Sequence, residues 1–139
     1  MKNIIYLILL VLPLTISSQE KELISGQVMI TCDLRTDIME EGGFKLLKKT
    51  KENGYTVSYY GANKAKITVK NSEEKIIGIG SANEDGTFTI SVKPDSFYIL
   101  EISFLTLKAE EALSSNDAKN LSIFIGKSSS SDMRELLGI

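Results

Sequence analysis

The sequence predicts an all-β protein that folds as a β-sandwich of about seven short strands. Apolar and polar residues alternate in several short runs between Ile24 and Ile125, which is the period of a strand with one buried face. Clusters of Gly, Asn, Asp and Ser separate these runs at intervals of about ten residues. Short alternating runs with frequent turns are typical of two packed sheets.

Residues 1–18 have the pattern of a secretory signal peptide. Lys2 gives a basic start, an unbroken apolar run spans residues 4–12, and Ser17 and Ser18 precede a charged stretch. A membrane span or a buried core helix is the alternative, but a span needs about 20 apolar residues. We therefore expect cleavage after Ser18, and an exported protein in the periplasm or outside the cell. We expect no transmembrane span in the mature chain.

The composition narrows the possible functions. Removing 18 of the 139 residues leaves 121, with 15 basic against 18 acidic residues, a mildly acidic balance that argues against a nucleic-acid partner. Histidine is absent, which excludes Ser-His-Asp and Cys-His catalysis and His-ligated zinc. Cys32 is the only cysteine, and we interpret it as a small core residue. A free thiol or an intermolecular bridge is the alternative.

The alternating runs predict strands over residues 23–32, 64–70, 75–80, 87–92, 98–107 and 121–126. Residues 87–92 and 98–107 are expected to form a central hairpin whose two arms share one buried face. The second of these arms is apolar on both sides, so we expect it to be central in its sheet or covered on both faces. Residues 108–119 are polar and predict at most one helical turn. The glycines of residues 75–80 indicate a bulge or a close backbone approach.

Residues 33–60 are interpreted as an insertion into the sandwich. Asn53 and Gly54 favour a tight turn, which predicts a hairpin over residues 45–60. A short helix over residues 39–51 is the alternative. An acidic cluster precedes the hairpin, formed by Asp33, Asp37, Glu40 and Glu41 around Arg35.

Tyr55, Tyr59 and Tyr60 are the candidate ligand-binding residues, because sugar rings stack on tyrosine faces. Ordinary strand packing is the alternative for all three. The acidic cluster is the only candidate for catalysis, and a solvated loop explains it better than a cleft with paired carboxylates. We expect no catalytic residues, no metal site and no cofactor.

Two further patterns have both a functional and a structural interpretation. Residues 83–86 combine carboxylates with an asparagine, which suits Ca²⁺, but the spacing of a calcium loop is missing and a plain turn is favoured. Lys64, Lys66 and Lys70 lie on one face of their strand. They fit an anion-binding patch or, as we favour, a device against edge-to-edge pairing.

The last segment, residues 127–139, is interpreted as a Ser-rich linker followed by a short helix. Asp132 and Glu135 resemble a capping box, and Met133, Leu136 and Leu137 would form the apolar side. This helix either docks on the sandwich or frays, and a partner-binding tail is the functional alternative. The expected organisation is thus a signal peptide over 1–18, a sandwich domain over 19–126 and a tail over 127–139.

Four stretches in order, residues 24–28, 61–71, 83–88 and 98–104, resemble the carboxypeptidase regulatory-like domains of exported Bacteroidetes-type proteins. The clearest likenesses are Ile24, Gly26 and Val28 at the opening and Gly86 and Phe88 after the acidic turn. The resemblance implies an Ig-like or prealbumin-like β-sandwich and a non-catalytic accessory module. Residues 33–60 are longer than the usual connection in that family.

The expected function is therefore that of an exported accessory module without catalytic activity. It would mediate protein interaction or structural support in the cell envelope, and its partner would be another exported or envelope protein. The alternative is a small-ligand or glycan-binding module that uses exposed tyrosines. An enzyme with paired carboxylates is the third and least supported hypothesis.

Overall fold

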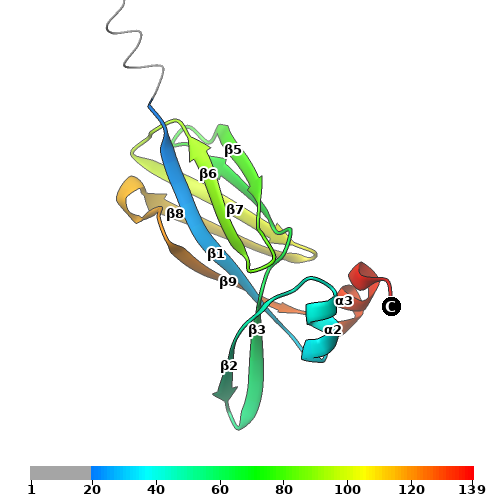
Figure 1. Ribbon diagram of the computed structural model, residues 1–139. Helices are drawn as coiled ribbons and strands as arrows, with labels where there is room; N and C mark the ends of the chain where they lie inside the picture. Colours follow the sequence, from blue (N-terminus) through cyan, green and yellow to red (C-terminus); the bar gives the residue numbers. More distant parts are fainter. Residues whose placement is uncertain (1–19) are drawn as a thin grey trace, which may run out of the picture.

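The computed structural model describes residues 20–139, and within them the chain forms two packed β-sheets (Figure 1). The predicted signal peptide, residues 1–18, lies outside the described residues. The first sheet contains β1 (Glu22–Cys32), β2 (Leu46–Glu52), β3 (Tyr55–Gly61), β6 (Thr87–Val92) and β9 (Leu121–Ser128). The second contains β4 (Lys66–Lys70), β5 (Ile76–Ser81), β7 (Phe97–Phe104) and β8 (Leu107–Ser114). The predicted all-β sandwich is confirmed.

Strand β1 is the axis of the first sheet. Its first half pairs antiparallel with β6, its second half pairs antiparallel with β3, and β9 runs parallel to it. Val28 lies where β1 passes from β6 to β3: its N–H donates to the Gly86 carbonyl and its carbonyl accepts from the Ala62 N–H. This eleven-residue strand therefore connects segments from the whole length of the described chain.

The core lies between the sheets and is formed by the alternate residues that the sequence predicts. In β7, residues 98, 100, 102 and 104 are buried while their neighbours are partly exposed, and β4 and β6 show the same alternation. Cys32 is a buried core residue, as predicted, and forms no disulfide within residues 20–139. The largest fully buried side chains are Tyr60, Tyr98, Ile24, Ile30, Met39, Ile67, Leu100, Ile102 and Met133.

The predicted central hairpin is wrong. Strand β6 pairs with β1 in the first sheet, whereas β7 pairs with β4 and β8 in the second. Residues 93–96 therefore cross from one sheet to the other, and the two strands line the same buried core from opposite sides. Alternation shows that two strands have apolar faces, but it does not distinguish side-by-side pairing from packing across a core.

Strand β4 also differs from the expectation, because it lies between β5 and β7 and is not an edge strand. Its lysines face outward, and Lys70 forms an ion pair of 2.5 Å with Glu101 on β7. The predicted bulge in β5 is present: Val69 pairs with Gly78 and Lys70 with Ile76, so Ile77 is the extra residue.

Residues 108–114, expected to hold at most one helical turn, form the edge strand β8 (Leu107–Ser114) together with Leu107. Leu107, Ala109 and Leu113 are half-buried against the core and alternate with exposed polar residues and Ala112. The short 3-10 helix η1 (Ser115–Asp117) follows. The strand was missed because alanine and glutamate are poor strand formers and weaken the pattern of alternation.

The C-terminal helix α3 (Ser130–Leu137) docks on the body of the protein. Strand β9 continues through Lys127 and Ser128, which the sequence suggested were a linker. The cap is Ser129, whose hydroxyl accepts from the Asp132 N–H, so Asp132 is not the cap residue. Met133 is fully buried, but Leu136 is 49 % exposed, contrary to the predicted apolar side. Helix α3 lies beside the short helix α2 (Thr36–Glu41), which the sequence did not predict (Figure 1).

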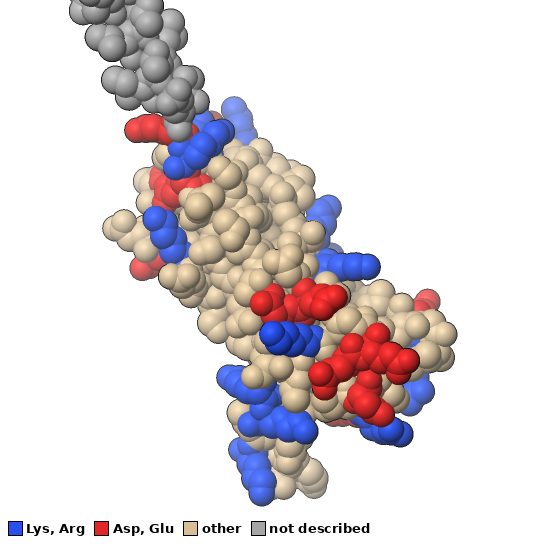
Figure 2. Space-filling model, in the orientation of Figure 1, with Lys and Arg blue, Asp and Glu red and all other residues tan. Residues whose placement is uncertain are grey.

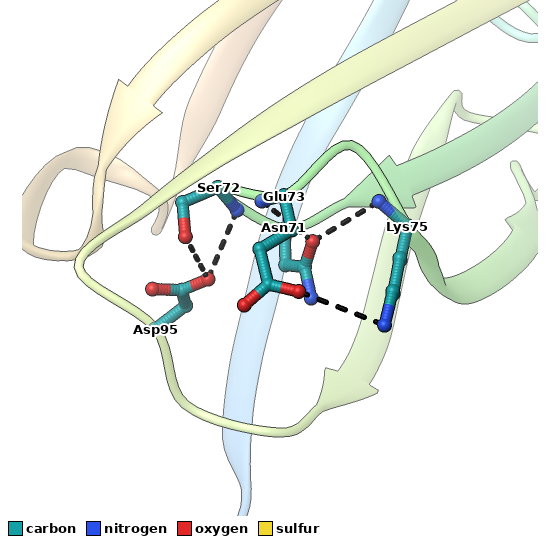
Figure 3. A network of polar contacts seen from close by, with 5 residues as sticks. All are labelled: Asn71, Ser72, Glu73, Lys75 and Asp95. Atoms are coloured by element: carbon teal, nitrogen blue, oxygen red, sulfur yellow. Dashed lines mark hydrogen bonds and ion pairs between the residues drawn. The ribbon is translucent and has the colours of Figure 1, made fainter.

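At one end of the sandwich, two loops from far apart in the chain are joined by polar contacts (Figure 3). The Asp95 carboxylate accepts from the Ser72 N–H at 2.9 Å and from its hydroxyl at 2.8 Å. These bonds hold the pKa of Asp95 below its ordinary value. Asn71 accepts from the backbone of Glu73 and Lys75 and so closes the β4–β5 turn. The contact between Ser72 and Asp95 holds in place the segment that connects β6 of the first sheet with β7 of the second.

Candidate functional site on the β2–β3 arm

Strands β2 and β3 form a hairpin that extends beyond the sandwich (Figure 1), and we call residues 46–61 the arm. The turn uses Asn53 at φ 53° and Gly54 at φ 83°, as a two-residue hairpin loop requires. The hairpin predicted over residues 45–60 is confirmed, and the alternative helix over residues 39–51 is wrong. In the described chain, β3 pairs with β1 only through residues 59–61, and β2 pairs only with β3. The outer arm therefore has free backbone edges.

One face of the arm carries a network of exposed polar and aromatic groups around Tyr59. The Tyr59 hydroxyl donates to Glu52 Oε2 at 2.7 Å, and the Thr50 hydroxyl donates to the same oxygen at 2.7 Å. The Lys48 Nζ lies 4.7 Å from the centre of the Tyr59 ring. The hydrogen bond raises the pKa of Tyr59 and, with the bond from Thr50, lowers the pKa of Glu52. These contacts order a two-stranded ribbon that has little core of its own.

Phe124, from β9, extends this face beyond the arm. Its ring meets the Tyr59 ring edge to face, with 5.6 Å between the ring centres, and the side chain is 50 % exposed. We call Tyr55, Tyr59 and Phe124 the aromatic face, since Tyr55 lies on the same side of β3 as Tyr59 and is 77 % exposed. Phe124 was not predicted. The available signal was a large apolar residue at an outward position of an alternating strand.

The structure separates the three predicted tyrosines. Tyr60 is fully buried on the other side of β3, and its hydroxyl lies 3.1 Å from the Thr36 hydroxyl of α2. Consecutive strand residues point to opposite faces, so Tyr59 and Tyr60 cannot share a binding surface. Tyr60 is therefore corrected from a candidate ligand-binding residue to a core residue that joins α2 to the base of the arm.

A hollow of about 380 Å³ lies beside the aromatic face, between β3 and the ends of β1 and β9. Tyr59 and Phe124 line it together with Glu52. Asp33 and Lys127 also line it and form an ion pair of 2.6 Å. The hollow thus places two aromatic rings next to carboxylates and an ammonium group.

Residues 46–112, from the start of β2 into β8, match the family model for the bacterial Ig domain. The matched stretch includes β4, β5 and β7 and most of β8, and the two-sheet architecture agrees with it. The fold is an Ig-like β-sandwich. Comparison with the curated proteins found no match. The family match supports a non-catalytic module, and it does not single out the carboxypeptidase regulatory-like resemblance.

The charges of this Ig-like sandwich are unevenly placed around the arm. Figure 2 shows basic side chains over the arm and acidic ones over the neighbouring region of α2. The arm contributes Lys48, Lys49 and Lys51 against the single acid Glu52, and it presents a net positive surface on a mildly acidic protein.

The acidic cluster does not converge on a cleft. Asp37 is exposed and paired with Arg35 at 2.5 Å, and this contact lowers the pKa of Asp37. Asp33 instead forms an ion pair with Lys127 on β9. Within residues 20–139, no three acids, cysteines or histidines are grouped to hold a metal ion. The arrangement gives the enzyme hypothesis no support from paired carboxylates.

The acidic turn before β6 has a structural role in the Ig-like sandwich. Asp85 accepts from the Thr87 hydroxyl at 2.6 Å and from the Thr87 N–H at 3.0 Å, and these bonds lower the pKa of Asp85. The carboxylate is thus used to close its own turn, as the plain-turn interpretation predicts. Among the described helices, none combines the length and the apolar character that crossing a bilayer requires.

Proposed function

We propose that this chain is an exported, non-catalytic Ig-like module that binds another exported or envelope protein through the β2–β3 arm. The observation that carries the proposal is the arm itself, a ribbon with free backbone edges that presents the exposed Tyr55 and continues into the half-buried Tyr59 beside the exposed Phe124. The pattern of residues 1–18 supports export. The resemblance to carboxypeptidase regulatory-like domains supports an accessory role.

The backbone of β2 is suited to pairing with an extended segment of a partner. A terminal strand presents unpaired N–H and C=O groups, and many binding modules add a partner strand at such an edge. Lys48, Lys49 and Lys51 line this edge. Lysines oppose pairing between two copies of the same edge, and they favour a partner segment with acidic residues.

The aromatic face would supply the anchor of the interface. Tyrosine and phenylalanine are enriched at protein interfaces, and tyrosine is frequent among the residues that dominate binding energy. Tyr59 is already ordered by Glu52 and Lys48, so it would lose little conformational freedom on binding.

Replacing both Tyr59 and Phe124 by serine is expected to abolish capture of the partner from an envelope extract at native expression. The loss follows from removal of the two adjacent rings that anchor the interface. The matched control replaces Ile76 and Ile79, two exposed apolar residues of β5 in the other sheet, by serine. The control variant should capture the same protein as the original chain.

Capture that fails equally with both variants, or survives in the variant without the aromatic rings, would contradict the proposal. Circular dichroism of both variants should show an unchanged β-sheet spectrum. A loss of capture by the double variant is therefore attributable to the surface and not to unfolding.

Small-ligand or glycan binding is the second candidate, favoured by the hollow beside Tyr59 and Phe124. Its carboxylates and Lys127 could hydrogen-bond hydroxyl groups of a sugar stacked on the rings. Under this function, a panel of glycans would raise the melting temperature of the original chain but not that of the serine variant. No protein would then be captured.

A further inference from the structure

A second pocket, of about 360 Å³, lies between α3, the start of β4 and the β7–β8 turn. Phe44 and Phe104 line it and contact each other edge to face, with 5.8 Å between ring centres. Leu105, which is 40 % exposed, and Leu136 complete an apolar lining. The size is within the range of small-ligand pockets, and it is separate from the aromatic face of the arm.

The rim of this pocket is cationic. Lys64 and Lys66 line it and are exposed, and neither forms an ion pair within the described residues. No aspartate or glutamate of residues 20–139 lines the pocket with them. An apolar cavity beside two unpaired ammonium groups is complementary to a ligand with one anionic end and an apolar body.

The backbone at the rim is in an unfavourable conformation. Leu105 has φ 52°, a left-handed conformation that costs an L-residue about 1–2 kcal/mol and that turns normally assign to Gly or Asn. It is the first residue of the two-residue turn between Phe104 and Leu107. A large apolar side chain at such a position lowers the stability of the fold, and at Leu105 it places a hydrophobic wall at the pocket mouth.

We propose that this pocket binds a small carboxylate with an apolar body, of the medium-chain fatty acid class, held at its charged end by Lys64 and Lys66. A peptide C-terminus has the same chemistry but also needs partners for its main chain. The N–H groups near the lysines are already used: Asn63 donates to Gly61, Lys64 to Ala82 and Ala65 to Ala62. The pocket therefore favours a ligand whose only polar group is the carboxylate.

Octanoate is expected to bind the folded chain and to shift the amide signals of Phe44, Leu105 and Leu136 in two-dimensional NMR spectra. Octanol, which has the same tail without the charge, should bind about tenfold more weakly, since a charge-assisted hydrogen bond contributes about that factor. Replacing Lys64 and Lys66 by glutamine should remove the difference between the two probes. The matched control, Lys93→Gln with Lys119→Gln, changes two exposed lysines that do not line the pocket and should leave the difference intact.

Leu105→Gly provides a second, independent test. Glycine accepts a positive φ without strain, so this variant should melt at a higher temperature than the original chain. It should also bind octanoate more weakly, because the wall of the pocket is removed. The proposal is overturned by octanoate that produces no saturable shifts at these residues, or by octanol that binds as well as octanoate. A leucine-terminated peptide that binds more tightly than octanoate would also overturn it.

Discussion

Gly86→Ala is expected to destabilise the sandwich by about 2–5 kcal/mol, the sum of a strained backbone and a steric clash in a packed site. Gly86 has φ 81°, and a Cβ atom there would lie 2.1 Å from the Val28 carbonyl oxygen. The clash cannot be relieved by a rotamer change, because the obstructing atom is backbone. The Gly86 carbonyl also accepts from the Val28 N–H at 2.8 Å, so any shift weakens the junction of β1 with β3 and β6.

Gly54→Ala is the matched control for this prediction. Gly54 has nearly the same φ, 83°, but apart from its two chain neighbours no described residue has an atom within 4 Å of the position its Cβ would take. Its cost should be limited to the backbone term of about 1–2 kcal/mol. Urea denaturation of both variants measures the difference. Equal losses of unfolding free energy in the two variants would contradict a tight contact between Gly86 and the Val28 carbonyl.

Alkaline pH is expected to destabilise the protein through Tyr98. Burial, reinforced by a hydrogen bond to Glu22, raises the pKa of Tyr98 from its usual 10 to about 12. The Tyr98 hydroxyl donates to Glu22 Oε2 at 2.7 Å and accepts from the Asp95 N–H at 3.0 Å, which connects β7 with the first residue of β1. An ionised phenolate beside the Glu22 carboxylate would be unfavourable in this buried position.

The direction of the effect follows from the raised pKa. The unfolded chain loses the Tyr98 proton near pH 10, while the folded chain keeps it until about pH 12. The contribution of Tyr98 to stability is therefore complete below pH 10 and is lost between pH 10 and 12. With about 1.4 kcal/mol for each pKa unit, the loss over this interval is about 3 kcal/mol.

Tyr98→Phe isolates this effect from the titration of other tyrosines and lysines. The variant should be less stable than the original chain at pH 8, because the hydrogen bond to Glu22 is absent. Its denaturation free energy should then fall less steeply between pH 10 and 12, so that the two curves converge. Parallel curves for the two proteins would contradict the assignment of the alkaline transition to Tyr98.

Much of the strand pattern could be predicted from the sequence because burial on one face imposes a period of two. Val28 and Ile30 in β1, Ile67 and Val69 in β4, and Ile123 in β9 are buried as their alternation indicates. The hairpin of the arm could also be predicted locally, because Asn53 and the glycine after it favour a tight turn. These features depend only on neighbouring residues in the chain.

The pairing of the strands could not be predicted in this way. Strands β6 and β7 follow one another in the chain, yet they belong to different sheets. The reason is that β6 pairs with β1, which lies about sixty residues earlier in the chain. Strand β8 was missed for a local reason, since its alanines and glutamates are poor strand formers and weaken the pattern of alternation. For β6 the deciding contacts are distant in sequence and leave little local trace, whereas β8 pairs with the preceding β7 across a two-residue turn.

The candidate site shows the same division. Tyr55 and Tyr59 were predicted, and the arm leaves Tyr55 exposed and Tyr59 half-buried. Phe124 joins them only because β9 runs parallel to β1 and brings residue 124 opposite Met29, two positions along β1 from the partner of Tyr59. A single sequence does not contain that register. Tyr60 was assigned to the site through its proximity in sequence, whereas the pleat of the strand places it in the core.

Site-specific photo-crosslinking in the native cell tests the central proposal, that the arm is where a partner binds, most directly. A photoreactive residue replaces Thr56, an exposed position on the arm, or Glu110, an exposed position on β8 in the other sheet. We predict one defined protein adduct from position 56 and none from position 110. An adduct formed equally well from position 110, or no adduct from position 56, would contradict the proposal.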